Sequence, residues 1–244
     1  MFHNYQRSTY LLATRHPWSC FLFLLPLLAA YEGGVWLLGG AQSQGFRNGA
    51  DAWLRWALDY FGLSQLYWAP LLIAGVFFAW SILRRRDRPA DILGVETGMA
   101  IESIGFALGL WSISRGLAPM LDQLGIHLDI APANAALGQV ITYVGAGIYE
   151  ELLFRLLLYS GLLILLRWLR FSLLLAVVLA ALSSSAFFSA AHHIGPYGEA
   201  FDNYVFLFRM LAGLYFALLY QLRGFGIAVG AHACYDVVVG VVVT

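Results

Sequence analysis

Residues 141–166 have the sequence ITYVGAGIYEELLFRLLLYSGLLILL, an apolar run that carries two glutamates and one arginine near its middle. A helix needs roughly 20 predominantly apolar residues to cross the hydrocarbon core of a bilayer, and this run is long enough. A charge at the centre of such a helix costs at least about 2.5–3.5 kcal/mol, so charged residues there usually face a bundle interior and serve a function. The segment therefore predicts a transmembrane helix with a functional cluster.

Similar apolar runs recur along the whole chain. Of its 244 residues 61% are hydrophobic and 11% are charged, whereas soluble domains have about 25% charged residues. The predicted spans are residues 18–38, 67–83, 99–117, 141–166, 171–192, 204–220 and 225–243. We read the first as a span and not a signal peptide, because it shows no clear cleavage site. The sequence thus predicts an all-α, polytopic transmembrane helical bundle of about seven spans, forming a single integral membrane domain over residues 1–244.

The arginines predict how the bundle is oriented. They follow the second, fourth and sixth spans, as Arg84, Arg85, Arg86, Arg88, Arg167, Arg170 and Arg223. The loops on the opposite side carry Asp122, Asp129, Glu199 and Asp202, with little arginine beyond Arg47 and Arg55. Positively charged loops face the cytoplasm. We therefore expect a multi-pass protein, in a prokaryotic cytoplasmic membrane, with its N-terminus inside.

A shorter segment, residues 51–61, differs from the spans. Trp53, Trp56 and Tyr60 fall at helical spacing there, with Asp51 and Arg55 between them. Trp and Tyr are enriched at membrane interfaces, so the segment is typical of a helix lying in the interface. An ordinary connecting helix is the alternative.

The charged cluster of the first segment consists of Glu150, Glu151 and Arg155. Glu151 and Arg155 are four residues apart, the spacing of an ion pair on one helical face. Glu150 is rotated by about 100° from Glu151, so Arg155 cannot neutralise both equally. One carboxylate stays available for acid and base chemistry. The alternative is an ion pair that only fixes the helix, beside a spare glutamate.

Two later spans carry further candidate residues. His192 ends a helix made slim by serine and alanine, although a single histidine at a helix end is often only interfacial, as we expect for His193. His232 and Asp236 are four residues apart and could bind water, a metal ion or a polarised carbonyl, or merely satisfy each other. Cys234 lies poorly for pairing with His232, and the two cysteines do not form a disulfide framework.

At these residues the chain resembles the CPBP family of type II CAAX prenyl proteases and bacteriocin-processing (Abi) proteases. The family's three motifs are EExxxR, FxxxH and HxxxN or HxxxD. They correspond to Glu150-Glu151 with Arg155, Phe188 with His192, and His232 with Asp236, in the family's order. The resemblance covers residues 141–244, the expected catalytic core, and nothing before about residue 130.

The resemblance implies hydrolysis of a peptide bond. Glu150 would take a proton from water, His192 would help to position that water, and Glu151 with Arg155 would support Glu150. His232 and Asp236 would stabilise the oxyanion or hold the water, although an ionised Asp236 cannot donate a hydrogen bond. The family is called both metallo- and glutamic protease. A zinc ion would take His192, His232 and either Glu150 or Asp236, but we favour a metal-free glutamate mechanism because no HExxH pair is present.

The expected substrate is a membrane-tethered peptide or protein, lipidated or tail-anchored, within the lipid bilayer. A nucleic-acid partner is not expected, because the formal net charge is zero. The predicted orientation opens the cavity towards the outside. Two other classes stay open: a non-catalytic membrane partner such as an immunity protein, and a proton-coupled transporter, since Glu and His in spans also form proton relays.

Overall fold

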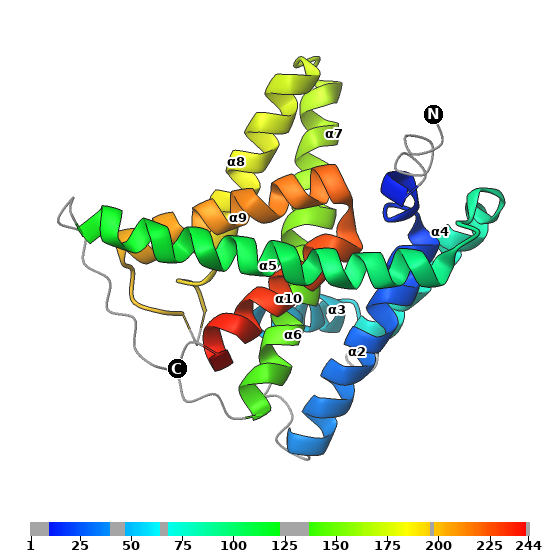
Figure 1. Ribbon diagram of the computed structural model, residues 1–244, viewed down its shortest axis with the longest axis horizontal. Helices are drawn as coiled ribbons and strands as arrows, with labels where there is room; N and C mark the ends of the chain where they lie inside the picture. The colour runs from blue at the N-terminus through cyan, green and yellow to red at the C-terminus, as the bar shows by residue number, and fades with distance from the viewer. Residues whose placement is uncertain (1–9, 40–46, 64–67, 123–136, 196–197, 243–244) are drawn as a thin grey trace.

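The computed structural model describes residues 10–39, 47–63, 68–122, 137–195 and 198–242. Over these ranges every regular element is helical and no strand is formed. The elements are α2 (Pro17–Gly39), α3 (Gly49–Tyr60), α4 (Trp68–Leu83), the short 3-10 helix η2 (Arg85–Asp87), α5 (Ile92–Asp122), α6 (Leu137–Glu151), the π-helix η3 (Leu152–Tyr159), α7 (Ser160–Trp168), α8 (Leu173–Ala191), α9 (Asn203–Arg223), α10 (Phe225–Val237) and the π-helix η4 (Val238–Val242) (Figure 1). The predicted all-α fold is confirmed.

Each predicted span lies on one or more of these helices. Within the described residues, α2, α8, α9 and the Ile92–Gly116 part of α5 are each long and apolar enough to cross a membrane, while α4 and the Phe225–Gly240 helix are shorter. The fourth span is a continuous helical rod of α6, η3 and α7. The helix of the third predicted span, α5, begins at Ile92 and not at Met99. Asp91 caps its start by accepting a hydrogen bond from the backbone nitrogen of Gly94, and the polar residues Glu96 and Thr97 follow within the helix before Met99.

Helix α10 lies at the centre of the bundle. Every residue from Phe225 to Ala233 is buried, and the helix packs against α5 on one side and α6 on another. In Figure 1, α5 runs across the front of α6 and α10. Gly147 lets α6 and α10 approach closely, since a Cβ there would lie 2.7 Å from the backbone nitrogen of Ala233 and 2.9 Å from the carbonyl oxygen of Val229. Small residues serve this purpose in membrane bundles.

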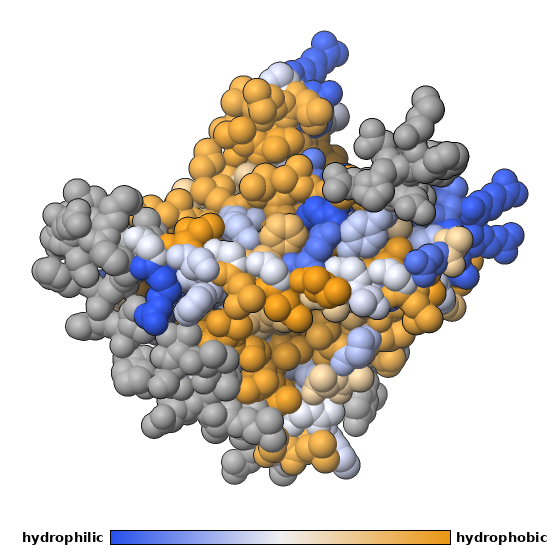
Figure 2. Space-filling view, in the orientation of Figure 1, coloured by the Kyte–Doolittle hydropathy of each residue, from blue (hydrophilic) through white to orange (hydrophobic). Residues whose placement is uncertain are grey.

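The outer surface is apolar to an extent that fits lipid contact. Large side chains such as Trp36, Leu37, Leu174 and Phe187 are each at least 60% exposed. Figure 2 shows apolar residues over most of the visible face, with hydrophilic side chains gathered at the α7–α8 turn and near η2. Soluble monomers rarely expose apolar patches of this kind. The chain is an integral membrane protein built as a helical bundle.

Candidate active site

Three helices bring one carboxylate and two imidazoles together. Glu150, in the last turn of α6, is buried, and its Oε2 lies 3.9 Å from Nε2 of His192 and 3.8 Å from Nε2 of His232. His192 directly follows α8, and His232 lies in the middle of α10. Two atoms about 3.8 Å apart can both reach a single water molecule at hydrogen-bond distance. The sequence pattern could not show this convergence, which joins three separate spans.

The other ring nitrogen of each histidine, Nδ1, has a hydrogen-bond partner, and that partner indicates which ring nitrogen carries the proton. Nδ1 of His192 lies 2.9 Å from the carbonyl oxygen of Phe188, and Nδ1 of His232 lies 2.8 Å from Oε1 of Glu151. Both partners accept, so each Nδ1 carries a hydrogen, and in the neutral form of each ring an unprotonated Nε2 faces Glu150. Three acceptor atoms then face one space, which suits a hydrogen donor such as water.

Aromatic rings confine both imidazoles. Phe216 stacks on His232 with ring centroids 4.4 Å apart and planes at 15°. Phe188 meets His192 and His232 edge-on, at 5.0 Å and 5.9 Å. Rings packed in this way cannot rotate freely, so the direction of each Nε2 is set before any ligand arrives.

The predicted ion pair between Glu151 and Arg155 is present and fully enclosed. Nε of Arg155 lies 3.2 Å from Oε2 of Glu151, at an angle outside hydrogen-bond geometry, and the two side chains are 1% and 0% exposed. Arg155 also donates to the carbonyl oxygen of Gly213 and lies over the ring of Phe188. Glu151 therefore contacts His232 and Arg155, and the support of Glu150 that the resemblance implies for this pair stays a prediction.

The chain changes helical type immediately after the two glutamates. Residues Leu152–Tyr159 form the π-helix η3, and this element carries Arg155. Short π-helical stretches inside α-helices are frequent at functional sites. The apolar sequence gives no signal of this change, because the same residues suit an ordinary α-helix.

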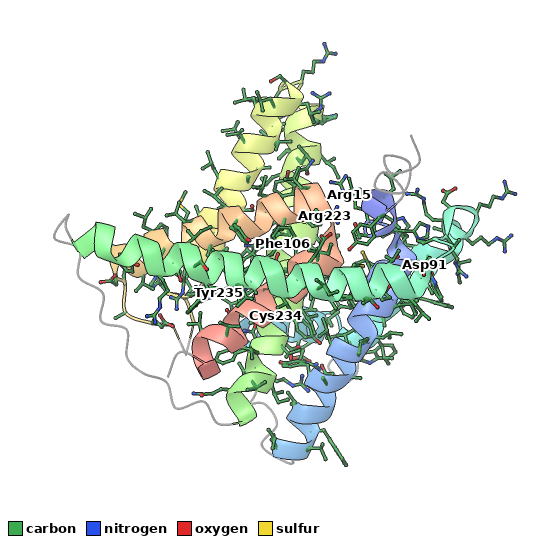
Figure 3. The ribbon with its side chains drawn as sticks, viewed as in Figure 1. Arg15, Asp91, Phe106, Arg223, Cys234 and Tyr235 are labelled. Atoms are coloured by element: carbon green, nitrogen blue, oxygen red, sulfur yellow. The ribbon has the colours of Figure 1, made fainter. Side chains whose placement is uncertain are left out.

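Asp236 completes the group of predicted residues. Its Oδ2 lies 3.5 Å from Nε2 of His232, one turn away on α10. Asp236 and Glu150 thus approach the same ring nitrogen from two helices. Cys234 is turned elsewhere: it lines a separate apolar cavity of about 580 Å³ between α2, α5 and α10, where α10 passes behind α5 (Figure 3).

A metal ion is the other way in which these acceptors could be satisfied. Among the described residues, no group of three or more His, Cys, Asp or Glu side chains is arranged to hold one. We derive no step through a metal.

Other ionisable residues within the spans pair away from this cluster. Glu102 of α5 accepts two hydrogen bonds of 2.8 Å from Arg223 at the end of α9. Arg209 donates two of 2.8 Å to Glu199, and these bonds hold the pKa of Glu199, in the α8–α9 loop, below its ordinary value. His193 contacts the backbone of Glu199 and not Glu150.

A polar network from the first part of the chain reaches the site and was not predicted. Asn48 donates to Oε1 of Glu150 at 3.0 Å, and behind it Arg47 and Arg55 pair with Glu32 and the fully buried Asp51. The signals were available: Glu32 interrupts the first apolar span, and the other three charges are spaced by four. Helix α3 therefore turns Asp51 and Arg55 inward, while Asp59 is exposed and Trp56 and Tyr60 are strongly exposed.

Comparison with known proteins supports the resemblance. Residues 132–238 match the family model described as type II CAAX prenyl endopeptidase, Rce1-like. This range contains all six predicted site residues, whereas Asn48 lies outside it. No curated protein and no solved structure matches the chain.

Proposed function

Residues 132–238 form an Rce1-like type II CAAX prenyl endopeptidase domain, consistent with the CPBP family, and on this premise we propose that the chain is an intramembrane endopeptidase. Its substrate is a membrane-tethered peptide or protein, and water activated by Glu150 cleaves the peptide bond. The observation that carries the proposal is the convergence of Glu150 Oε2 with Nε2 of His192 and Nε2 of His232.

The chemistry follows from which atoms can accept protons. Glu150 takes a proton from water as the water oxygen attacks the scissile carbonyl carbon, and the carbonyl electrons move onto oxygen. One of the two imidazoles, His192 or His232, accepts the second hydrogen of that water at its free Nε2 and so orients it. When the tetrahedral intermediate collapses, the C–N bond breaks and Glu150 returns its proton to the departing amine. Asp236, which faces the same Nε2 of His232, helps to hold the water.

An apolar groove beside His192 favours a substrate that is anchored in lipid. It has a volume of about 210 Å³ and is lined by Trp53, Phe154, Phe187 and Ile194, among others. Trp53 comes from α3 and the other three from η3, α8 and the residues just after it. An apolar anchor at this groove would place the adjoining peptide near the glutamate.

The proposal is tested with membrane-anchored reporter peptides expressed beside the chain. Replacing the general base, Glu150→Gln, should lower cleavage by about 10²- to 10⁴-fold, and His192→Ala or His232→Ala should each cause a large loss. His193→Ala is the matched control, because this neighbouring histidine does not face Glu150, and it should retain cleavage. The size of the reporter recovered from membranes is the measurement.

Either of two results would overturn the proposed activity. Cleavage that survives Glu150→Gln and both histidine variants would exclude this site. A folded parent chain that cleaves no reporter would count against a protease, and specific binding of a partner would then favour the immunity alternative.

A further inference from the structure

Asn48 connects the start of α3 to Glu150 with both ends of its amide. Its Oδ1 accepts a hydrogen bond of 2.8 Å from the backbone nitrogen of Ala50 and so caps α3, while its Nδ2 donates to Oε1 of Glu150 at 3.0 Å. Only the oxygen can accept from a backbone N–H, so the cap fixes which way the amide points. The NH₂ group must therefore face the carboxylate.

The position of Asn48 is itself held by buried polar groups. Its backbone nitrogen donates to the hydroxyl of Tyr31 at 3.1 Å, and that hydroxyl donates to Asp51 at 2.9 Å. Asp51 is fully buried and pairs with Arg47 at 2.7 Å and Arg55 at 2.6 Å. A buried network of this kind costs a great deal to break, which makes the start of α3 a rigid support.

The two oxygens of Glu150 have separate partners. Oε1 receives the hydrogen bond from Asn48, and Oε2 faces His192 and His232. A carboxylate can rotate about its last bond, and such terminal torsions are broad. A donor on Oε1 restricts this rotation and leaves the lone pairs of Oε2 directed at the space between the imidazoles.

We propose that Asn48 is a positioning residue for Glu150, which holds the carboxylate in the orientation needed to take a proton from water. This inference rests on the proposed function. It extends the site beyond residues 132–238, because the positioning group comes from the loop that leads into α3.

The test uses substitutions that keep the helix cap and remove only the donor. Ser is an N-cap residue as good as Asn, so Asn48→Ser should leave the thermal stability close to that of the parent. Losing a hydrogen bond to a charged group in the reacting state should lower the rate constant by about 10- to 100-fold. We expect kcat of Asn48→Ser on the cleaved reporter to fall by about that factor while KM changes less than about twofold, and Asn48→Asp to fall further because two carboxylates then repel.

The matched control is Ser172→Ala, which removes the N-cap of α8, where Ser172 accepts from the backbone nitrogen of Leu175. It should reduce thermal stability and leave kcat unchanged. The positioning role would be overturned if Asn48→Ser kept the kcat of the parent. It would also be overturned if the fall in kcat came with an equally large loss of thermal stability and an equally large change in KM. In both cases an inactive Glu150→Gln would leave the proposed function intact. Activity in Glu150→Gln would overturn the proposed function, and with it the role of Asn48.

Discussion

Removing the carboxylate charge of Glu151 should leave Arg155 as an uncompensated cation in the middle of the bundle. The two side chains are 0% and 1% exposed, and their nearest charged atoms are 3.2 Å apart. With an effective dielectric constant of about 20, this separation corresponds to roughly 5 kcal/mol of attraction, which offsets the cost of burying both ions. We therefore expect Glu151→Gln to lower the free energy of unfolding by about 3–5 kcal/mol, and Arg155→Met to do the same.

The double variant separates this cause from lost packing. In Glu151→Gln/Arg155→Met neither charge remains, and the glutamine oxygen can still accept from Nδ1 of His232. Its cost should be well below the sum of the two single costs, by more than about 2 kcal/mol, because replacing a whole buried ion pair is often nearly neutral. Equilibrium unfolding in mixed detergent and dodecyl sulfate micelles, followed by circular dichroism, measures all four proteins. If the double variant instead lost as much free energy of unfolding as the two single variants together, the ion-pair explanation would be refuted.

Three further predictions concern pH, orientation and metal dependence. Glu199→Gln removes the partner of Arg209 and should lower the free energy of unfolding by about 0.2–1 kcal/mol. Because the pKa of Glu199 is lowered in the folded protein, this difference in stability should be complete above the ordinary glutamate pKa of about 4.3 and should disappear as the pH falls through the lower folded pKa. A difference that does not change with pH would contradict this prediction. If the site opens outward, an impermeant thiol reagent applied to a cysteine-free background should label Ile194→Cys in intact cells and Trp168→Cys only after lysis. Both positions are strongly exposed. The reverse labelling pattern would invert the predicted orientation. Finally, dialysis against o-phenanthroline should leave reporter cleavage unchanged under the glutamate mechanism, whereas a loss restored by zinc would contradict it.

The sequence predicted those features that depend on one helix at a time. Long apolar runs located the helices, and spacing by four predicted that Glu151 would meet Arg155 and His232 would meet Asp236, as both pairs do. A regular helix fixes the relative direction of residues within a turn, so such pairs can be derived without tertiary information.

Features that depend on two or more helices could not be derived in this way. The contact between Glu151 and His232 joins α6 to α10 across 81 positions of sequence, and that between Asn48 and Glu150 crosses 102. Hydropathy gives no weight to an asparagine in a polar connection, because such residues usually serve turns and caps. Asn48 does cap a helix, and its second hydrogen bond depends on where that helix lies in the bundle.

The close approach at Gly147 has a consequence for how the site meets its substrate. Glu150 follows Gly147 by about one turn on α6, and His232 lies between Val229 and Ala233, the residues of α10 that face Gly147 through backbone and Cβ atoms. Backbone atoms in contact have no rotamers to exchange, so the distance between the two backbones that carry the carboxylate and the imidazole is fixed by the helices. The reacting groups therefore require little reorganisation when substrate binds, and the entropy of bringing them together is lost during folding, before any peptide arrives.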